Sequence, residues 1–104
     1  MPVKIEIHDE VVTACLVGDI DHHTAKQMRE EIDAAVQRSQ PKVLELNFKD
    51  VTFMDSSGIG LVMGRYRLMQ TMEGEVRITQ APSHIVKVMK LAGMDKLATF
   101  EKNK

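Results

Sequence analysis

The sequence is short of several residue types, and each shortage narrows what the protein can be. Its 104 residues include no tryptophan and a single cysteine, Cys15, which excludes a disulfide framework. Lysine and arginine number 14 against 15 for aspartate and glutamate, so no excess of positive charge is present to attract nucleic acid or an anionic membrane surface. No run approaches the roughly 18 apolar residues of a membrane span. We therefore expect a soluble, cytoplasmic protein with no direct nucleic-acid or membrane partner.

What is present suffices for one small domain, which we take to span residues 1–104. A chain of this length buries a single core and is too short for a substrate domain beside a cofactor domain. Aromatic residues make up only 4% and methionine occurs eight times, which predicts an aliphatic core with Met filling irregular gaps. Cys15 lies in the apolar run VVTACLV, and we expect it to be a buried structural thiol.

Apolar residues that alternate with polar ones predict the strands. Val3, Ile5 and Ile7 alternate with charged neighbours, and Asp9 and Glu10 turn the chain into the apolar run 11–17, so the sequence predicts an opening β-hairpin. Further strands are predicted at 43–48 and around 76–78, and a short last one at 97–100.

Three stretches have the apolar spacing of helices. The first should end near Ser39 ahead of Pro41, the second should run from Ser56 or Ser57 until Gly74 breaks it, and the third should open at Pro82 and stop at Gly93. Their predicted inward faces are Ala25, Met28, Ile32, Ala35 and Val36 in the first, Ile59, Val62, Tyr66 and Met69 in the second, and Ile85, Val88, Met89 and Ala92 in the third.

Strands that alternate with helices predict an α/β fold built from parallel βαβ units, connected right-handed, with the strands buried under helices. The turns that leave parallel strands all open at the same edge of the sheet, where ligands and partners usually bind. GDIDHHT (18–24) and MDSSGIG (54–60) both leave predicted strands. We therefore expect these two segments to be neighbours in space.

The segment MDSSGIG is compatible with a helix cap, a phosphate cradle, a nucleophile or a site of modification. A nucleophile elbow needs G-x-S-x-G, but Met54 stands two residues before Ser56. A dinucleotide fingerprint needs its third glycine one residue before Gly64, and no P-loop G-K-[ST] is present. Because a helix N-terminus favours anions, a nucleotide-binding domain remains an alternative.

The purely structural interpretation of Asp55, Ser56 and Ser57 is that they cap the second helix. Two glycines four residues apart on that helix each cost about 1 kcal/mol of helix propensity. A surface for close docking of a partner would explain this cost, and close packing of the helix against the sheet is the alternative. The outward face so predicted consists of Gly60, Met63, Gly64 and Arg67.

Asp21, His22 and His23 precede the first helix, but two adjacent histidines with one carboxylate have no recognisable metal-ligand spacing. We expect neither a metal nor a cofactor. Asp21 suits the N-cap of the first helix. Because Asp21 and Ser56 should lie at the same edge of the sheet, Asp21 is also a candidate for partner contact or for orienting Ser56.

The segments VGDIDHHTA, VLELNFKDVTFMDSSGIGLVMGRYR and KLAGMDKLATF closely resemble the anti-sigma factor antagonists of the STAS domain family. The resemblance covers nearly the whole chain, and DHHTA together with MGRY fits the sporulation branch. It implies a mixed, mostly parallel sheet with sequential strand order and a partner switch rather than an enzyme. It also implies a further C-terminal helix, which we expect this sequence to lack after EKNK, leaving apolar surface near Leu97 and Phe100 less covered.

The resemblance further implies that the unphosphorylated form binds an anti-sigma factor that is also a serine kinase, and so releases the sigma factor. The kinase then phosphorylates the first serine of D-S-S-G, which is Ser56 here, and a PP2C-like serine phosphatase resets the switch. A cytoplasmic regulatory module of an anion transporter has the same fold and is an alternative. The residues that we expect to take part in partner binding are Asp21, Asp55, Ser57, Gly60, Met63, Gly64 and Arg67, with Ser57 mainly a helix cap.

Overall fold

The strands form one mixed sheet in which strands that follow one another along the chain are also neighbours in space. The computed structural model describes residues 2–101. The sheet order is β1-β2-β3-β4-β5, with β1 antiparallel to β2 and every later pair parallel. The predicted α/β fold, the opening hairpin and the sequential order are confirmed. The strands are β1 (Val3–His8), β2 (Val11–Ile20), β3 (Val43–Met54), β4 (Glu75–Thr79) and β5 (Thr99–Phe100).

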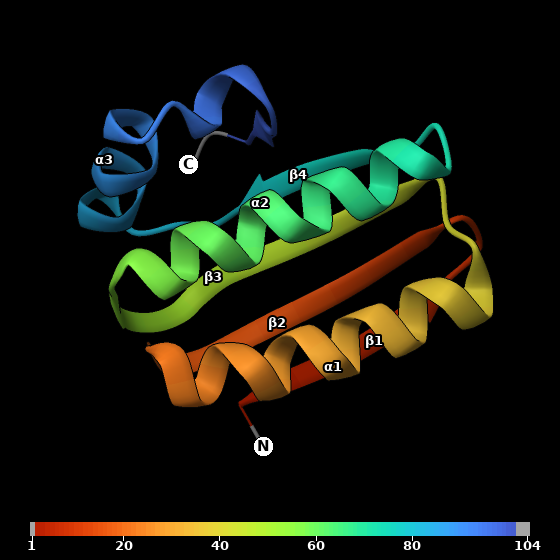
Figure 1. Ribbon diagram of the computed structural model, residues 1–104, viewed down its shortest axis with the longest axis horizontal. Helices are drawn as coiled ribbons and strands as arrows, with labels where there is room; N and C mark the ends of the chain where they lie inside the picture. The colour runs from red at the N-terminus through yellow and green to blue at the C-terminus, as the bar shows by residue number, and fades with distance from the viewer. Residues whose placement is uncertain (1, 102–104) are drawn as a thin grey trace.

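Two long helices lie side by side over the same face of the sheet (Figure 1). They are α1 (His22–Ser39), between β2 and β3, and α2 (Ser56–Thr71), between β3 and β4. A shorter helix, α3 (Ser83–Leu91), and a single 3₁₀ turn, η1 (Met94–Lys96), connect β4 to β5. None of the helices in residues 2–101 combines the length and apolar character that crossing a bilayer requires.

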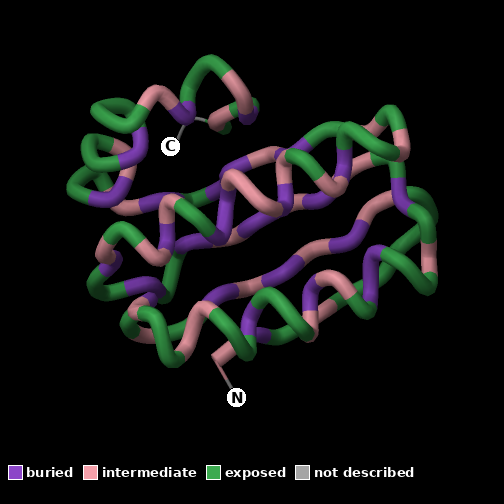
Figure 2. Tube along the Cα trace, viewed as in Figure 1, coloured by how far each residue is buried: buried purple, intermediate pink, exposed green. Residues whose placement is uncertain are grey.

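The core lies between the sheet and the helices α1 and α2, where Figure 2 shows buried positions on the facing sides of the two layers. Alternation along the strands sends Val12 and Ala14 of β2 to this face, in register with Leu44 and Leu46 of β3. The helices contribute Met28, Ile32, Ala35 and Val36 from α1, and Leu61, Val62 and Met69 from α2. The predicted inward face of α1 is thus largely confirmed. In α2 the prediction was only half right, since Val62 and Met69 are buried but Ile59 and Tyr66 are half-buried.

The opposite face of the sheet carries polar side chains, so the expectation that helices bury the strands holds for one face only. Lys4 and Glu6 of β1 are exposed there, opposite Cys15 and Thr13 of β2. Cys15 is half-buried rather than buried, and desolvation raises the pKa of its thiol above the ordinary value. The prediction of a buried structural thiol was therefore wrong in degree.

Strand β3 continues six residues beyond the predicted 43–48, to Met54. Its pairing with β2 shifts register twice, between Cys15 and Val17 and between Gly18 and Asp19. These irregularities break the period of two, since beyond Phe48 only Val51 and Met54 of the strand are buried. Because an alternation pattern stops where a bulge begins, the second half of β3 could not be recognised from the sequence.

The ends of α1 and α3 agree with the sequence, but one face does not. Helix α1 ends at Ser39, and Gln40 adopts a left-handed conformation (φ 50°) just before Pro41. Val88 of α3 and its C-cap Ala92 were expected to face inward, yet both are exposed, because only Ile85 and Met89 of this short helix are buried.

Gly58 lies in the first turn of α2, where this helix comes closest to the end of β3. A Cβ atom on Gly58 would overlap the Met54 side chain and would lie 3.4 Å from Cγ2 of Ile20. A Cβ atom on Gly60, one half-turn further on, would meet no described atom within 4 Å. The tight entry into α2 therefore requires glycine at position 58 and not at position 60.

We predict opposite effects for the two matched substitutions. Gly58→Ala should lower the free energy of unfolding by about 1–3 kcal/mol, because Met54 must leave its buried position. Gly60→Ala should raise the free energy of unfolding by up to about 1 kcal/mol through helix propensity. Urea denaturation followed by circular dichroism measures both, and equal stabilities of the two variants would contradict the close approach at Gly58.

Candidate functional site

The starts of α1 and α2 meet at one edge of the sheet. Ile20 at the end of β2 pairs with Met54 at the end of β3, and the backbone N–H of Asp55 donates to the carbonyl of Ile20 at 3.1 Å. A second link joins the same strands, since the Thr52 hydroxyl donates to the Asp19 carboxylate at 2.7 Å. The prediction that GDIDHHT and MDSSGIG are neighbours is confirmed.

Asp55 caps α2 and leaves Ser56 free. The Asp55 carboxylate accepts a hydrogen bond from the backbone N–H of Ser57 at 2.7 Å, and its backbone is extended (φ −99°, ψ −166°), as N-caps require. Ser56 is the first residue of the helix and is exposed. Within residues 2–101 the Ser56 hydroxyl has no hydrogen-bond partner, so it is accessible for reaction with another molecule.

Ser57 was expected to act mainly as a helix cap, and this was wrong. The cap is Asp55, and Ser57 lies inside the first turn, where it donates its backbone N–H to that cap. Its side chain is half-buried and lines the space between α1 and α2. One residue of helix rotation therefore separates the exposed Ser56 from Ser57, which points into the space between the helices.

Asp21 caps α1 in a complete capping box. Its carboxylate accepts from the backbone N–H groups of His23 at 2.9 Å and Thr24 at 3.0 Å, while its own N–H donates to the Thr24 hydroxyl at 3.0 Å. The hydrogen bonds from Thr24 and then His23 lower the pKa of this carboxyl. Capping is therefore its structural role, and no bond joins Asp21 to Ser56 in the described part of the chain.

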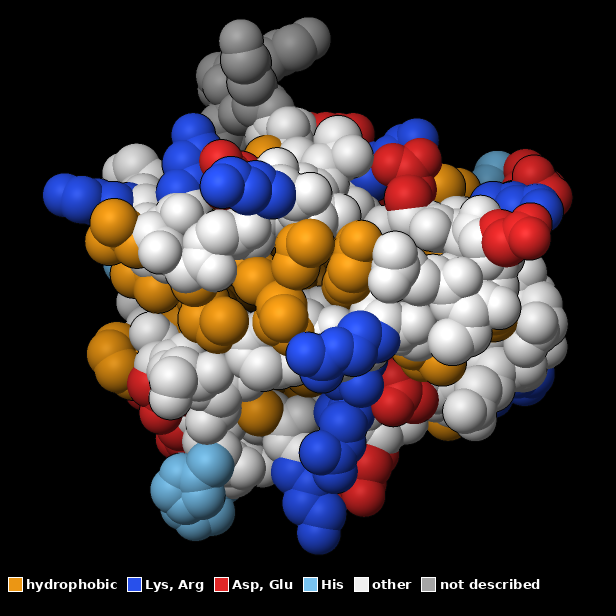
Figure 3. Space-filling view, turned by 45° about the horizontal axis from the view of Figure 1, so that its top comes forward, with side chains coloured by type: hydrophobic (Ala, Val, Ile, Leu, Met, Phe, Trp, Pro, Cys, Tyr) orange, Lys and Arg blue, Asp and Glu red, His pale blue; other side chains and the backbone are white. Residues whose placement is uncertain are grey.

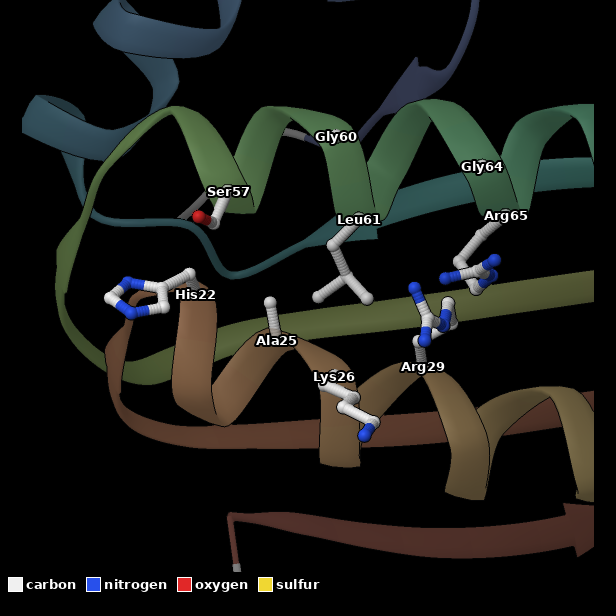
Figure 4. A pocket seen from close by; sticks show the side chains of 9 residues that line it. All are labelled: His22, Ala25, Lys26, Arg29, Ser57, Gly60, Leu61, Gly64 and Arg65. Atoms are coloured by element: carbon white, nitrogen blue, oxygen red, sulfur yellow. The ribbon is translucent and has the colours of Figure 1, made fainter.

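A groove of about 520 Å³ separates α1 from α2 and opens to solvent (Figure 4). Ser57 lies at the end of the groove where both helices begin, as does His22. From α1 the groove receives His22, Ala25, Lys26 and Arg29, and from α2 it receives Ser57, Gly60, Leu61, Gly64 and Arg65. It therefore begins next to Ser56 and carries several basic groups.

Arg65 joins the two helices through a buried ion pair. Its Nε lies 2.8 Å from Oδ1 of Asp33 on α1, and the two side chains are 7% and 28% exposed. Both atoms are buried and lack hydrogen-bond geometry, so the contact is one of charge. Burial lowers the pKa of Arg65 and raises the pKa of Asp33, which means that desolvation outweighs the attraction within the pair.

The predicted outward face of α2 is only partly outward. Gly60 and Arg67 are exposed, but Met63 is half-buried and packs against the core rather than standing free. Gly60 and Gly64 line the groove, and a Cβ atom on either would meet no described atom within 4 Å. Close packing against the sheet therefore does not explain these two glycines.

Residues 2–101 contain no group of three or more His, Cys, Asp or Glu side chains that is arranged to hold a metal ion. The rings of His22 and His23 lie against each other, with centroids 3.9 Å apart.

The family model that matches this chain is that of the STAS domain, and it matches residues 2–104. The chain belongs to the STAS domain family. Similar proteins include the anti-sigma F factor antagonists of Paenibacillus polymyxa, 32% identical over 99% of this chain and 88% of the relative, and of Lysinibacillus sphaericus, 34% identical over 82% and 73%.

Among solved structures, this STAS domain is similar to SpoIIAA, an anti-sigma factor antagonist whose structure is known in the unphosphorylated form. The two chains are 29% identical, the TM-score is 0.83, and the match covers 97% of this chain and 89% of SpoIIAA. SpoIIAA in the phosphorylated form matches with a TM-score of 0.76 over 97% and 92% of the two chains. The family assignment made from the sequence is thereby confirmed.

Several residues of this STAS domain's site were not predicted. Arg65 and its partner Asp33 were not among the site residues expected from the sequence. Lys26 and Arg29 line the groove, and nothing in a single helix pattern shows that a second helix lies opposite. Phe53 is 54% exposed immediately before the turn, and exposed aromatic residues are typical of interfaces.

We predict that the ion pair between Asp33 and Arg65 stabilises the fold only as an intact pair. Asp33→Asn should lower the free energy of unfolding, because it leaves the buried Arg65 charge without a partner. We expect a loss of about 2 kcal/mol, less than for a fully buried pair, since Asp33 is partly exposed. Glu30→Gln, which removes an exposed carboxylate of the same helix, is the matched control and should change it by less than about 0.5 kcal/mol.

Replacing both partners by leucine separates the pair from its parts. Asp33→Leu with Arg65→Leu should be more stable than Asp33→Asn in urea denaturation, because no buried charge is left. A double variant that is less stable than Asp33→Asn would show that the ion pair itself carries the stability.

Proposed function

We propose that this STAS domain is an anti-sigma factor antagonist that phosphorylation of Ser56 switches off. The observation that carries the proposal is the exposed, unbonded Ser56 hydroxyl at the start of α2, beside a cap that Asp55 already provides. The names of its relatives, anti-sigma F factor antagonists, support the kind of target. The existence of SpoIIAA in two phosphorylation states supports the kind of switch.

The position of Ser56 suits a substrate of another enzyme. A kinase must reach the acceptor oxygen, and the exposed Ser56 offers it without competition from an internal hydrogen bond. Ser57 is half-buried in the groove, so its hydroxyl is the poorer acceptor. A serine phosphatase of the PP2C-like class would reach the phosphoserine at the same exposed edge.

The phosphate acts on binding more than on folding. It adds a charge of about −1.5 to −2 and three acceptor oxygens at the N-terminus of α2, where the helix dipole favours negative charge. A partner that packs over Ser56 would have to accommodate both the bulk and the desolvation of this charge. Every ~1.4 kcal/mol lost at such an interface is a tenfold loss of affinity.

The partner surface that we propose surrounds Ser56. Phe53, which the sequence did not single out, offers an exposed aromatic ring on the strand side of the turn. Asp21, with its carboxylate engaged in capping, would contribute through its remaining acceptor capacity. The other members are those expected from the sequence, namely Asp55, Ser57, Gly60, Met63, Gly64 and Arg67, and the partner is an anti-sigma factor that is also a serine kinase.

Incubation with the anti-sigma F factor of Paenibacillus polymyxa and magnesium ATP should add one phosphate to this domain, at Ser56. Peptide mass spectrometry locates the phosphate. Ser56→Ala should abolish the labelling because the acceptor is gone, and Ser57→Ala, the matched control, should retain it. Labelling that persists in Ser56→Ala would place the acceptor elsewhere.

The unphosphorylated state should be the binding state. In titration calorimetry with the same anti-sigma F factor, Ser56→Ala should bind like the unmodified domain, because it keeps the surface neutral. Ser56→Asp should bind at least about tenfold more weakly, a loss of about 1.4 kcal/mol or more. Equal affinities of the two variants would show that the interface does not cover Ser56.

A further inference from the structure

The groove between α1 and α2 has a surplus of positive charge. Three of its lining residues, Lys26, Arg29 and Arg65, are cations, and no carboxylate is among the residues that line it in the described chain. Asp33 pairs with Arg65 and so offsets one charge. Figure 3 shows Lys and Arg side chains in a strip on the lower half of the face drawn, with Asp and Glu side chains at its right edge and His side chains further to the left. The net charge of the whole chain is only −1, so this surplus is local.

The two walls of the groove differ in a way that leaves room for a foreign side chain. On α1, Lys26 and Arg29 are three residues apart, so they project from the same side of the helix, and both are exposed. On α2, Gly60 and Gly64 face the groove without side chains, and the space at their Cβ positions is empty of described atoms. The α2 wall also carries the side chains of Leu61 and Arg65, so the room for a foreign side chain lies beside Gly60 and Gly64, opposite Lys26 and Arg29.

Arg29 and Arg65 are close enough to influence each other. After burial, repulsion from Arg29 is a further cause that lowers the pKa of Arg65, against the attraction of Asp33. Two guanidinium groups with one carboxylate between them remain charged at neutral pH, since arginine does not lose its proton in proteins. An additional carboxylate in the groove would relieve this repulsion.

The shape of the groove favours a protein surface over a small molecule. Sites for small ligands are mostly apolar and enclose most of the ligand. This groove is open to solvent, its exposed lining residues include Lys26 and Arg29, and its end at Ser57 adjoins Ser56. It is thus continuous with the surface that we assign to the partner.

We propose that the groove between α1 and α2 receives carboxylate side chains of the anti-sigma factor when that protein docks over Ser56. This inference rests on the proposed function and extends it from the phosphorylation site to a second patch of the same interface. Lys26 and Arg29 hold the carboxylates at the rim, and Gly60 and Gly64 admit them. The partner surface that fits here is therefore acidic.

The groove also gives the switch an electrostatic mechanism. A phosphate on Ser56 lies one residue from Ser57, at the end of the groove, and brings a charge of about −2 toward the same cations. It attracts Lys26 and Arg29 and repels the partner's carboxylates, so phosphate and partner compete for one set of charges. Both the association rate and the affinity fall in consequence.

The test compares two charge reversals of equal size. Lys26→Glu with Arg29→Glu reverses two cations at the rim of the groove. The matched control, Arg38→Glu with Lys42→Glu, reverses two exposed cations in the last turn of α1 and just beyond it. With the anti-sigma F factor of Paenibacillus polymyxa as the probe, the groove variant should bind at least about tenfold more weakly than the control. Its affinity should also fall less steeply as salt rises from about 0.05 M to about 0.5 M.

A third comparison isolates the competition. Ser56→Asp should cost less affinity in the groove variant than in the unmodified domain, because the charges that it competes for are gone. Lys26→Gln with Arg29→Gln, which removes the two charges without reversing them, should bind the anti-sigma F factor with an affinity between those of the unmodified domain and the charge-reversal variant. Circular dichroism checks that each variant is folded.

The outcomes are distinct. If the unmodified domain does not bind the probe, the proposed function fails and this inference falls with it. If it binds and the groove variant binds equally well, the proposed function stands and the inference is overturned. If inorganic pyrophosphate binds the free domain through Lys26 and Arg29 while partner affinity does not change between the variants, the groove is a small-anion site and the inference is likewise overturned.

Discussion

The parallel pairing of β2 with β3 determines where everything else in the site can be. Because both strands run the same way and end in register at Ile20 and Met54, both following helices begin at the same edge of the sheet. Their dipoles then point their positive ends in the same direction, and the space between them becomes the groove. An antiparallel pair would have placed the second helix start at the opposite edge, far from the first. The hydrogen bond from Asp55 to Ile20 ties the two starts together.

The starts of α1 and α2 are each capped by an aspartate of the same chain before any partner arrives. Asp21 and Asp55 use their carboxylates on N–H groups of their own helices. The Ser56 hydroxyl therefore makes no hydrogen bond within residues 2–101, although it lies in the capped first turn of α2. A residue without structural duty is free to be modified, since its change disturbs no internal contact. Because Asp55 provides the cap, Ser56 can be phosphorylated without loss of the hydrogen bond that caps α2.

The architecture could be predicted from the sequence, because strand and helix periods are local properties of the chain. The hairpin, the two long helices and the neighbouring turns follow from such patterns. The second half of β3 could not be predicted, since bulges erase the alternation after Phe48. Nor could the contact between Asp33 and Arg65, because the two residues lie on different helices and only the packing of α1 beside α2 brings them together. The choice between Asp55 and Ser57 as cap depended on a shift of two residues in where the helix begins, which composition alone does not resolve.

The uncovered face of the sheet has a consequence for how a signal can travel. The buried side chains of α1 and α2 pack on one face of the sheet, and the other face carries Lys4 and Glu6 of β1 and Thr13 of β2. A two-layer domain of this kind has no second core against which α2 could repack if it shifted, so any displacement of that helix would expose apolar surface to water. A change of charge at the edge of the sheet where α2 begins is therefore sensed by a partner that contacts that same edge.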